Sequence, residues 1–159
     1  MEPNDAASPP AGPAPDASAA AVRLAAALAA RLNAVVPRPF RVRAEGGWVA
    51  RYHGESWEGS SDVAGVLDQP IAPDETDEQW KFPGLAAGIA WNALSSVQDG
   101  VSETTTEPWP QLPGGGMALP GTRTDGERVF LWYGPDHESE ADAVLLLPPI
   151  SLAAISGQG

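Results

Sequence analysis

The segment 83–105 constrains the fold of this chain most strongly, because it carries the longest amphipathic pattern in the sequence. Its apolar residues recur at helical spacing, and polar residues occupy the opposite side of the helical wheel. The apolar side comprises Leu85, Ala86, Ile89, Ala90, Ala93, Leu94, Val97 and Val101, and the polar side comprises Asn92, Ser95, Ser96, Asp99 and Glu103. Pro83 suits the first position of a helix, and Pro108 follows its end. The pattern predicts one long helix with one buried side.

A second helix is predicted over residues 17–36. Leu24, Leu28 and Leu32 recur there every four residues, in an alanine-rich context. Asp16 or Ser18 is suited to cap the start of this helix, and Pro37 ends it.

Strands are predicted between and after the two helices. The predicted strands cover residues 40–45, 48–53, 121–124, 127–133 and 143–147, with short additional strands at Trp57 and at 63–67. Gly46-Gly47 and Asp125-Gly126 mark the turns of two hairpins, and Pro148-Pro149 is expected to stop the last strand. Short connections favour antiparallel pairing. The sequence therefore predicts an α+β fold, with a mainly antiparallel sheet of five to six strands and two helices packed on one face.

The predicted domain organisation is simple. Residues 1–16 are rich in Pro and Ala and are expected to form a disordered tail. Residues 17–152 are expected to form a single α+β domain, with a mobile acidic loop at about 68–80, and residues 153–159 a frayed C-terminus.

Composition excludes several classes of function. The chain carries 9 Lys and Arg against 21 Asp and Glu, a net charge of -12, which argues against a nucleic-acid or anionic-membrane binder. It has no Cys and only two His, so thiolate sites, a Cys nucleophile and a His-rich metal centre are not expected. No cofactor and no metal are predicted. No apolar run reaches the length of a membrane span, no signal peptide is recognisable, and a cytoplasmic location is expected.

The hairpin at Gly46-Gly47 carries the most distinctive candidate binding residues: Arg41, Arg43, Arg51, Trp48 and Tyr52. A two-residue loop would place Arg41 and Arg43 on one face with the two aromatic residues, where cation–π contacts form. A three-residue loop would instead align the three arginines with His53, over a clean apolar face. The second register resembles a half-buried antiparallel pair more closely, and we favour it on that ground. Neutralisation of the arginines by the chain's own acidic loops is the simplest alternative to a binding role.

Other polar constellations carry weaker signals. Asp99 and Glu103 lie four residues apart on one side of the long predicted helix and are an alternative carboxylate site, although a solvated helix face is the favoured interpretation. His53 with Glu55 and Glu58 has too few local ligands for zinc. Neither the glycine run 114–116 nor any serine lies in a known catalytic or phosphate-binding motif, so no catalytic residue is predicted.

Two segments carry a resemblance to other proteins. They are LSSVQDGVSE at 94–103, followed by EPWP at 107–110, and VFLWYG at 129–134, ahead of LLLPPI at 145–150. Together they resemble a group of small uncharacterised proteins common in actinobacterial genomes. The resemblance covers residues 20–152, and it implies a lineage without any activity or site residue.

These observations favour a non-enzymatic, acidic interaction domain that binds a protein partner or forms a homodimer. The order of its elements is similar to that of small dimeric secretion-chaperone-like domains, which is a fold-level analogy and suggests a chaperone-like adaptor. Two alternatives stay open. One is a small hydrolase or ligand-binding enzyme that uses Asp99 and Glu103, and the other is an acidic mimic of nucleic acid that binds a basic protein.

Overall fold

A computed structural model describes residues 17–69 and 81–157. The elements are α1 (Ala19–Asn33), β1 (Phe40–Glu45), β2 (Trp48–His53), β3 (Ser56–Asp62), α2 (Ala64–Leu67), α3 (Phe82–Thr105), β4 (Leu119–Thr124), β5 (Arg128–Gly134), β6 (Leu145–Ser151) and α4 (Leu152–Ser156). The predicted tail at 1–16 and most of the predicted acidic loop at 68–80 lie outside the described residues.

Both predicted helices are present, and the start of α1 is fixed by two side chains. The Ser18 hydroxyl accepts a hydrogen bond from the backbone N–H of Ala21 at 3.1 Å, as an N-cap residue does. The same hydroxyl donates to the Asp68 carboxylate at 2.7 Å, and the backbone N–H of Ser18 donates to its other oxygen at 2.9 Å. Asp68, which follows α2, therefore anchors the start of α1.

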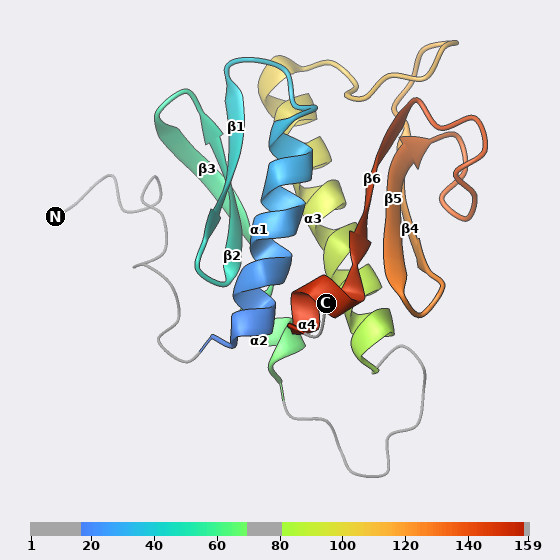
Figure 1. Cartoon of the computed structure of the whole chain (residues 1–159). Coiled ribbons are helices and arrows are strands. Elements are labelled where there is room, and N and C mark those ends of the chain that lie inside the picture. The colour runs from blue at the N-terminus through green and yellow to red at the C-terminus, as the bar shows by residue number, and fades with distance from the viewer. Residues whose placement is uncertain (1–16, 70–80, 158–159) are drawn as a thin grey trace, which may run out of the picture.

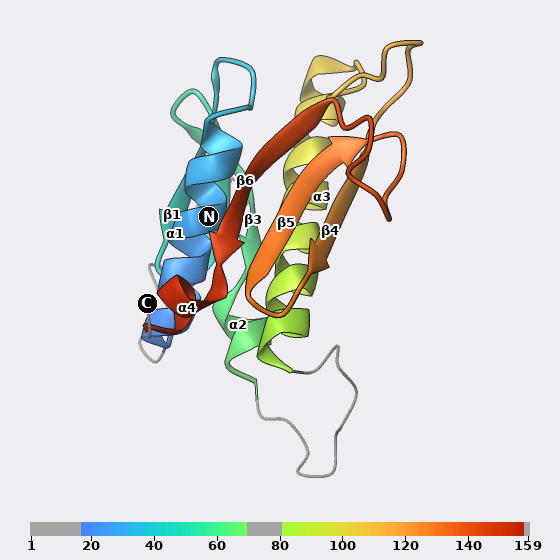
Figure 2. The same cartoon turned by 45° about the vertical axis from the view of Figure 1, so that its right-hand side comes forward.

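The strands form two separate sheets, so the expectation of one five- to six-stranded sheet is wrong, whereas the α+β class and the antiparallel pairing are confirmed. β1, β2 and β3 form one antiparallel meander, and β4, β5 and β6 form the other. α1 and α3 lie between the two sheets and do not share one outer face (Figures 1 and 2). The long α3 separates β3 from β4 along the chain and packs beside both strands.

The edges of the second sheet are occupied by helix side chains, which explains why the two sheets do not join. On β4, the Trp91 indole N–H of α3 donates to the carbonyl of Pro120 at 3.2 Å. On β6, the Arg31 guanidinium of α1 donates to the carbonyls of Pro148 and Pro149 at 2.7 and 2.8 Å. Burial lowers the pKa of Arg31. Edge carbonyls that accept helix side chains are not available to another strand.

Three local expectations differ from the structure. Residues 64–67 form the short helix α2, where a strand was expected. β6 continues through Pro148-Pro149 to Ser151, because a register shift against β5 lets an edge strand carry prolines without losing its pairing. Residues 152–156, expected to fray from 153, form α4, in which Leu152 and Ile155 are buried.

One apolar core fills the space between the sheets. It joins the buried sides of α1 and α3 to the inner faces of both sheets. In the first sheet Phe40, Val42 and Val49 point inward, and in the second sheet Val129, Leu131 and Tyr133 do so. The Tyr133 hydroxyl donates to the carbonyl of Leu94 in α3 at 2.7 Å. Burial, followed by the negative charge of Asp99, holds the pKa of Tyr133 well above its usual value.

Candidate functional site

The β1–β2 hairpin has the two-residue Gly46-Gly47 loop, so the register favoured from the sequence is wrong. Arg41 lies opposite Tyr52, and Glu45 lies opposite Trp48. This register turns Arg41, Arg43, Trp48 and Tyr52 to the outer face of the first sheet. Trp57 of β3 lies opposite Tyr52 and joins them. These five residues are called the arginine–aromatic face below.

The arginine–aromatic face is layered. The Arg43 guanidinium carbon lies 4.8 Å from the centroid of the Tyr52 ring, in cation–π geometry. The Tyr52 hydroxyl donates to the Glu45 carboxylate, which fixes the ring. Ala50 lies on the same face and is only 1% exposed, so the larger side chains of this face bury it from solvent. The guanidinium groups of Arg41 and Arg43 form its exposed surface.

The electrostatics of Tyr52 follow from the same contacts. Burial raises the pKa of the Tyr52 phenol, and the hydrogen bond to the Glu45 carboxylate raises this pKa further. The positive charge of Arg43 above the ring acts in the opposite direction. The ring is therefore held between a carboxylate and a guanidinium that act on it in opposite ways.

Arg51, which was predicted to belong to the same set, lies on the other side of the sheet. Its side chain packs towards α3, where it donates to the carbonyl of Ser96 at 3.1 Å, and it also donates to the carbonyl of Glu58 at 3.3 Å. Its Nε lies 3.5 Å from the Glu58 carboxylate. Gly59 and Gly100 leave the space that this guanidinium occupies. The contacts of Arg51 join the first sheet to α3.

A groove runs along β1 beside the C-terminal end of α1. Its volume is about 670 Å³. The residues that line it are Asn33, Ala34, Val36, Arg38, Pro39, Phe40, Arg41, Val42, Arg43 and Gly54. It is called the arginine groove below, because the guanidinium-bearing residues Arg38, Arg41 and Arg43 are its only charged members. The Asn33 side-chain carbonyl accepts the backbone N–H of Val42 at 2.9 Å and so occupies part of the β1 edge.

The three arginines of this groove differ from the other five arginines of the chain. The other five donate to carbonyls or pair with carboxylates: Arg23, Arg31, Arg51, Arg123 and Arg128. Within residues 17–69 and 81–157, Arg38, Arg41 and Arg43 form no hydrogen bond and no ion pair through their side chains. Neutralisation by the chain's own carboxylates is thus not found in the part of the chain that the structure describes.

The alternative carboxylate site is not gathered into a cleft. Asp99 and Glu103 lie on the exposed side of α3, one turn apart, and neither lines any of the three cavities described here. His53 packs edge-on against Phe40, with ring centroids 4.9 Å apart. Within the described ranges, no group of three or more His, Asp or Glu residues is placed to hold a metal ion.

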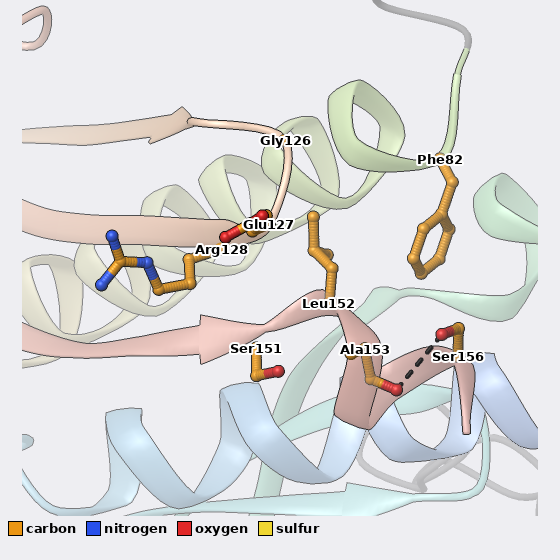
Figure 3. A pocket seen from close by; sticks show the side chains of 8 residues that line it. All are labelled: Phe82, Gly126, Glu127, Arg128, Ser151, Leu152, Ala153 and Ser156. Atoms are coloured by element: carbon orange, nitrogen blue, oxygen red, sulfur yellow. Dashed lines mark hydrogen bonds between the residues drawn. The ribbon is translucent and has the colours of Figure 1, made fainter. Parts of the chain in front are cut away.

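Two other cavities lie against α3. Figure 3 shows one of about 540 Å³, between the start of α3, the β4–β5 turn and α4. Phe82 and Leu152 bring apolar side chains to it, whereas its Arg128 pairs with Asp125 and its Ser156 hydroxyl donates to the carbonyl of Ala153. The other, of about 340 Å³, lies along α3 between α2 and Trp91. Neither brings together unpaired polar groups.

Trp57 is the one residue of the arginine–aromatic face that was not predicted from the sequence. Its indole nitrogen is buried without a hydrogen-bond partner among the described residues. Side chains alternate between the two faces of a strand, but the face to which Trp57 belongs can be assigned only when the pairing of β3 with β2 is known. A register shift between Arg51 and Tyr52 prevents that pairing from being inferred from the sequence.

The chain matches no protein-family model, no curated protein and no solved structure. Among residues 17–69 and 81–157, no helix has both the length and the apolar character that crossing a membrane requires.

Proposed function

We propose that this protein is a non-enzymatic interaction domain that binds a protein partner through the arginine–aromatic face. The observation that supports the proposal is the contrast between the outer faces of the two sheets. On the outer face of β4–β6 the chain's own residues bury Trp132 fully and pair Arg123 with Glu140, although Leu146 opposite Trp132 stays exposed. The outer face of β1–β3 ends in the guanidinium groups of Arg41 and Arg43, which no described carboxylate contacts.

The chemistry of the arginine–aromatic face suits protein recognition. Trp, Tyr and Arg are the residues that most often dominate the binding energy of protein interfaces. The Tyr52 ring is already fixed by Arg43 and Glu45, so little side-chain freedom is lost when a partner binds. The net charge of -12 disfavours nucleic acid as the partner.

The remaining expectations complete the proposal. The partner is a different protein or a second copy of the chain, and the protein acts as a chaperone-like adaptor in the cytoplasm. The absence of cysteine supports the location, and the segments 94–103 and 129–134 support a relation to the small actinobacterial proteins that they resemble.

The test is affinity capture of the tagged full chain from its native cells. Arg41→Gln with Arg43→Gln is compared with wild type and with Arg128→Gln, a matched control on the other sheet. We expect the double variant to lose at least about tenfold of the captured partner, which corresponds to about 1.4 kcal/mol of binding energy. The control should retain it, and the double variant should unfold at the same temperature as wild type. A partner list that does not change in the double variant contradicts the proposal.

A further inference from the structure

The second sheet shows how this chain satisfies an arginine that lies over an aromatic ring. The Arg123 guanidinium carbon lies 4.0 Å from the centroid of the Phe130 ring on the outer face of that sheet. The Glu140 carboxylate accepts hydrogen bonds from Arg123 Nε at 3.0 Å and from its Nη2 at 2.6 Å. This pairing raises the pKa of Arg123 and lowers that of Glu140. The guanidinium is thus held between a ring and a carboxylate.

The carboxylate comes from a segment with a regular acidic pattern. Residues 135–144 connect β5 to β6, and every second residue from 136 to 142 is acidic: Asp136, Glu138, Glu140 and Asp142. The backbone of this segment also covers the sheet, since the carbonyl of Asp136 accepts the Trp132 indole N–H at 2.9 Å. This acidic, irregular segment therefore covers the part of the outer face of β4–β6 that carries Trp132 and Arg123.

The first sheet has the arginine over the ring, but the Glu45 carboxylate on that face accepts from the Tyr52 hydroxyl and does not pair with the arginine. Arg43 lies over Tyr52 as Arg123 lies over Phe130, and no described carboxylate reaches Arg43. Arg41 stands two residues before Arg43 on the same face of β1, and Arg38, which precedes β1, also lines the groove. Alternate residues of an extended chain lie about 7 Å apart. Arg41 and Arg43 are alternate residues of β1, so their spacing matches that of alternate side chains in an extended partner segment.

We propose that the arginine groove binds an extended acidic segment of the protein partner, with carboxylates at alternate positions. Arg41 and Arg43 pair with two successive carboxylates, and Arg38 pairs with a third. This inference rests on the proposed function, because it names the partner segment that the arginine–aromatic face receives. Asn33 already occupies the backbone N–H of Val42, so the segment is held by side chains and does not extend the sheet.

Charge favours a peptide over a nucleic acid. Residues 61–159 contain fifteen acids, and their basic residues are Lys81, Arg123 and Arg128, which gives this part of the chain a net charge of -12. A long polyphosphate would experience this negative field along its whole length, whereas a short acidic segment experiences it only beside the groove. Guanidinium groups pair with planar carboxylates in a fixed, bidentate geometry.

The experiment uses the full chain and a labelled peptide with the sequence of residues 135–143, Pro-Asp-His-Glu-Ser-Glu-Ala-Asp-Ala. Its matched control has Asn and Gln in place of the four acids. Binding is measured by fluorescence anisotropy at low and at high salt. We expect the acidic peptide to bind and the amide peptide not to bind. Arg41→Gln with Arg43→Gln should weaken binding at least about tenfold, high salt should weaken it too, and Arg128→Gln should leave it unchanged.

Three outcomes overturn the inference: equal binding of the two peptides, no binding of either, or tighter binding of a single-stranded oligonucleotide of the same length through the same arginines. The proposed function fails separately. If cellular capture depends on Arg41 and Arg43 but the acidic peptide does not bind, the interaction surface stands and the acidic partner segment is wrong. If the peptide binds through these arginines but capture does not depend on them, the groove binds acidic segments and the proposed function is wrong.

Discussion

The two halves of the described chain have the same order of elements, a helix followed by a three-stranded meander, but they treat their outer sheet faces differently. The outer face of β4–β6 carries Trp132, which the chain covers with its own 135–144 segment. The outer face of β1–β3 carries Trp48, which lies opposite Glu45 and stays partly exposed on the same face as Arg41 and Arg43. In both halves an arginine lies over an aromatic ring. Among the described residues, a carboxylate pairs with this arginine in the second half and not in the first.

This difference separates stability from binding. Apolar surface that the chain itself buries stabilises the folded state. Apolar surface that stays exposed is buried when a partner binds, and it then contributes to the free energy of binding. We therefore expect substitutions on the outer face of β4–β6 to change the free energy of unfolding, and substitutions on the arginine–aromatic face to change partner binding.

The largest effect is expected from a matched pair of tryptophans. Trp132→Ala removes a fully buried side chain that packs on Gly121, and it should lower the free energy of unfolding by about 3–5 kcal/mol. Trp48→Ala removes a half-buried side chain and should cost about 1 kcal/mol. Urea unfolding followed by circular dichroism gives both values. Equal losses would show that the face of β1–β3 is covered in solution as well.

The next effect concerns how the first sheet is attached to α3. A Cβ at Gly100 would clash with the Arg51 guanidinium, which is held in place by its hydrogen bond to the carbonyl of Ser96, so Gly100→Ala should destabilise the protein by about 1–3 kcal/mol. Gly88 lies on the same helix with open space around it, and Gly88→Ala should stabilise by up to about 1 kcal/mol through helix propensity. Opposite signs in urea unfolding support the arginine contact, and the same sign for both variants argues against it.

A smaller, pH-dependent effect on stability is expected from the Asp125-Gly126 turn and not from the Gly46-Gly47 turn. Backbone N–H groups of Glu127 and Arg128 donate to the Asp125 carboxylate and lower its pKa to about 2. A carboxylate with a depressed pKa stabilises the fold above its unfolded pKa of 3.8, and this contribution is lost as the pH falls towards 2. The Gly46-Gly47 turn has no such group. The urea midpoint of wild type should therefore drop more between pH 4 and pH 2 than that of Asp125→Asn, and identical drops would contradict the turn geometry.

The sequence predicted the helices and both hairpins, because amphipathic period and turn residues are local properties. It predicted neither the division into two sheets nor the side of the sheet to which Arg51 points. Both depend on contacts far along the chain: Trp91 occupies the edge of β4, and Gly100 leaves space for Arg51. The wrong register at Gly46-Gly47 was favoured because it gathers Ala50 and Tyr52 with the other apolar residues of the hairpin on one face, whereas both are buried on the outer face of the sheet.

The smallest effect tests the layered geometry of that face directly, through the two tyrosines of the chain, one on each sheet. Tyr133 is on an inner face, and its deep burial holds its pKa well above that of an ordinary phenol, whereas Tyr52 lies on the outer face of its sheet. Glu45→Gln removes a negative charge that raises the Tyr52 pKa and should lower it. Arg43→Gln removes a positive charge that lowers this pKa and should raise it. Phenolate absorbance measured against pH gives both shifts, with Tyr52→Phe to identify the signal. Shifts of opposite sign require the ring to lie between the carboxylate and the guanidinium, which is the arrangement an acidic partner segment would meet, and shifts of the same sign would contradict it.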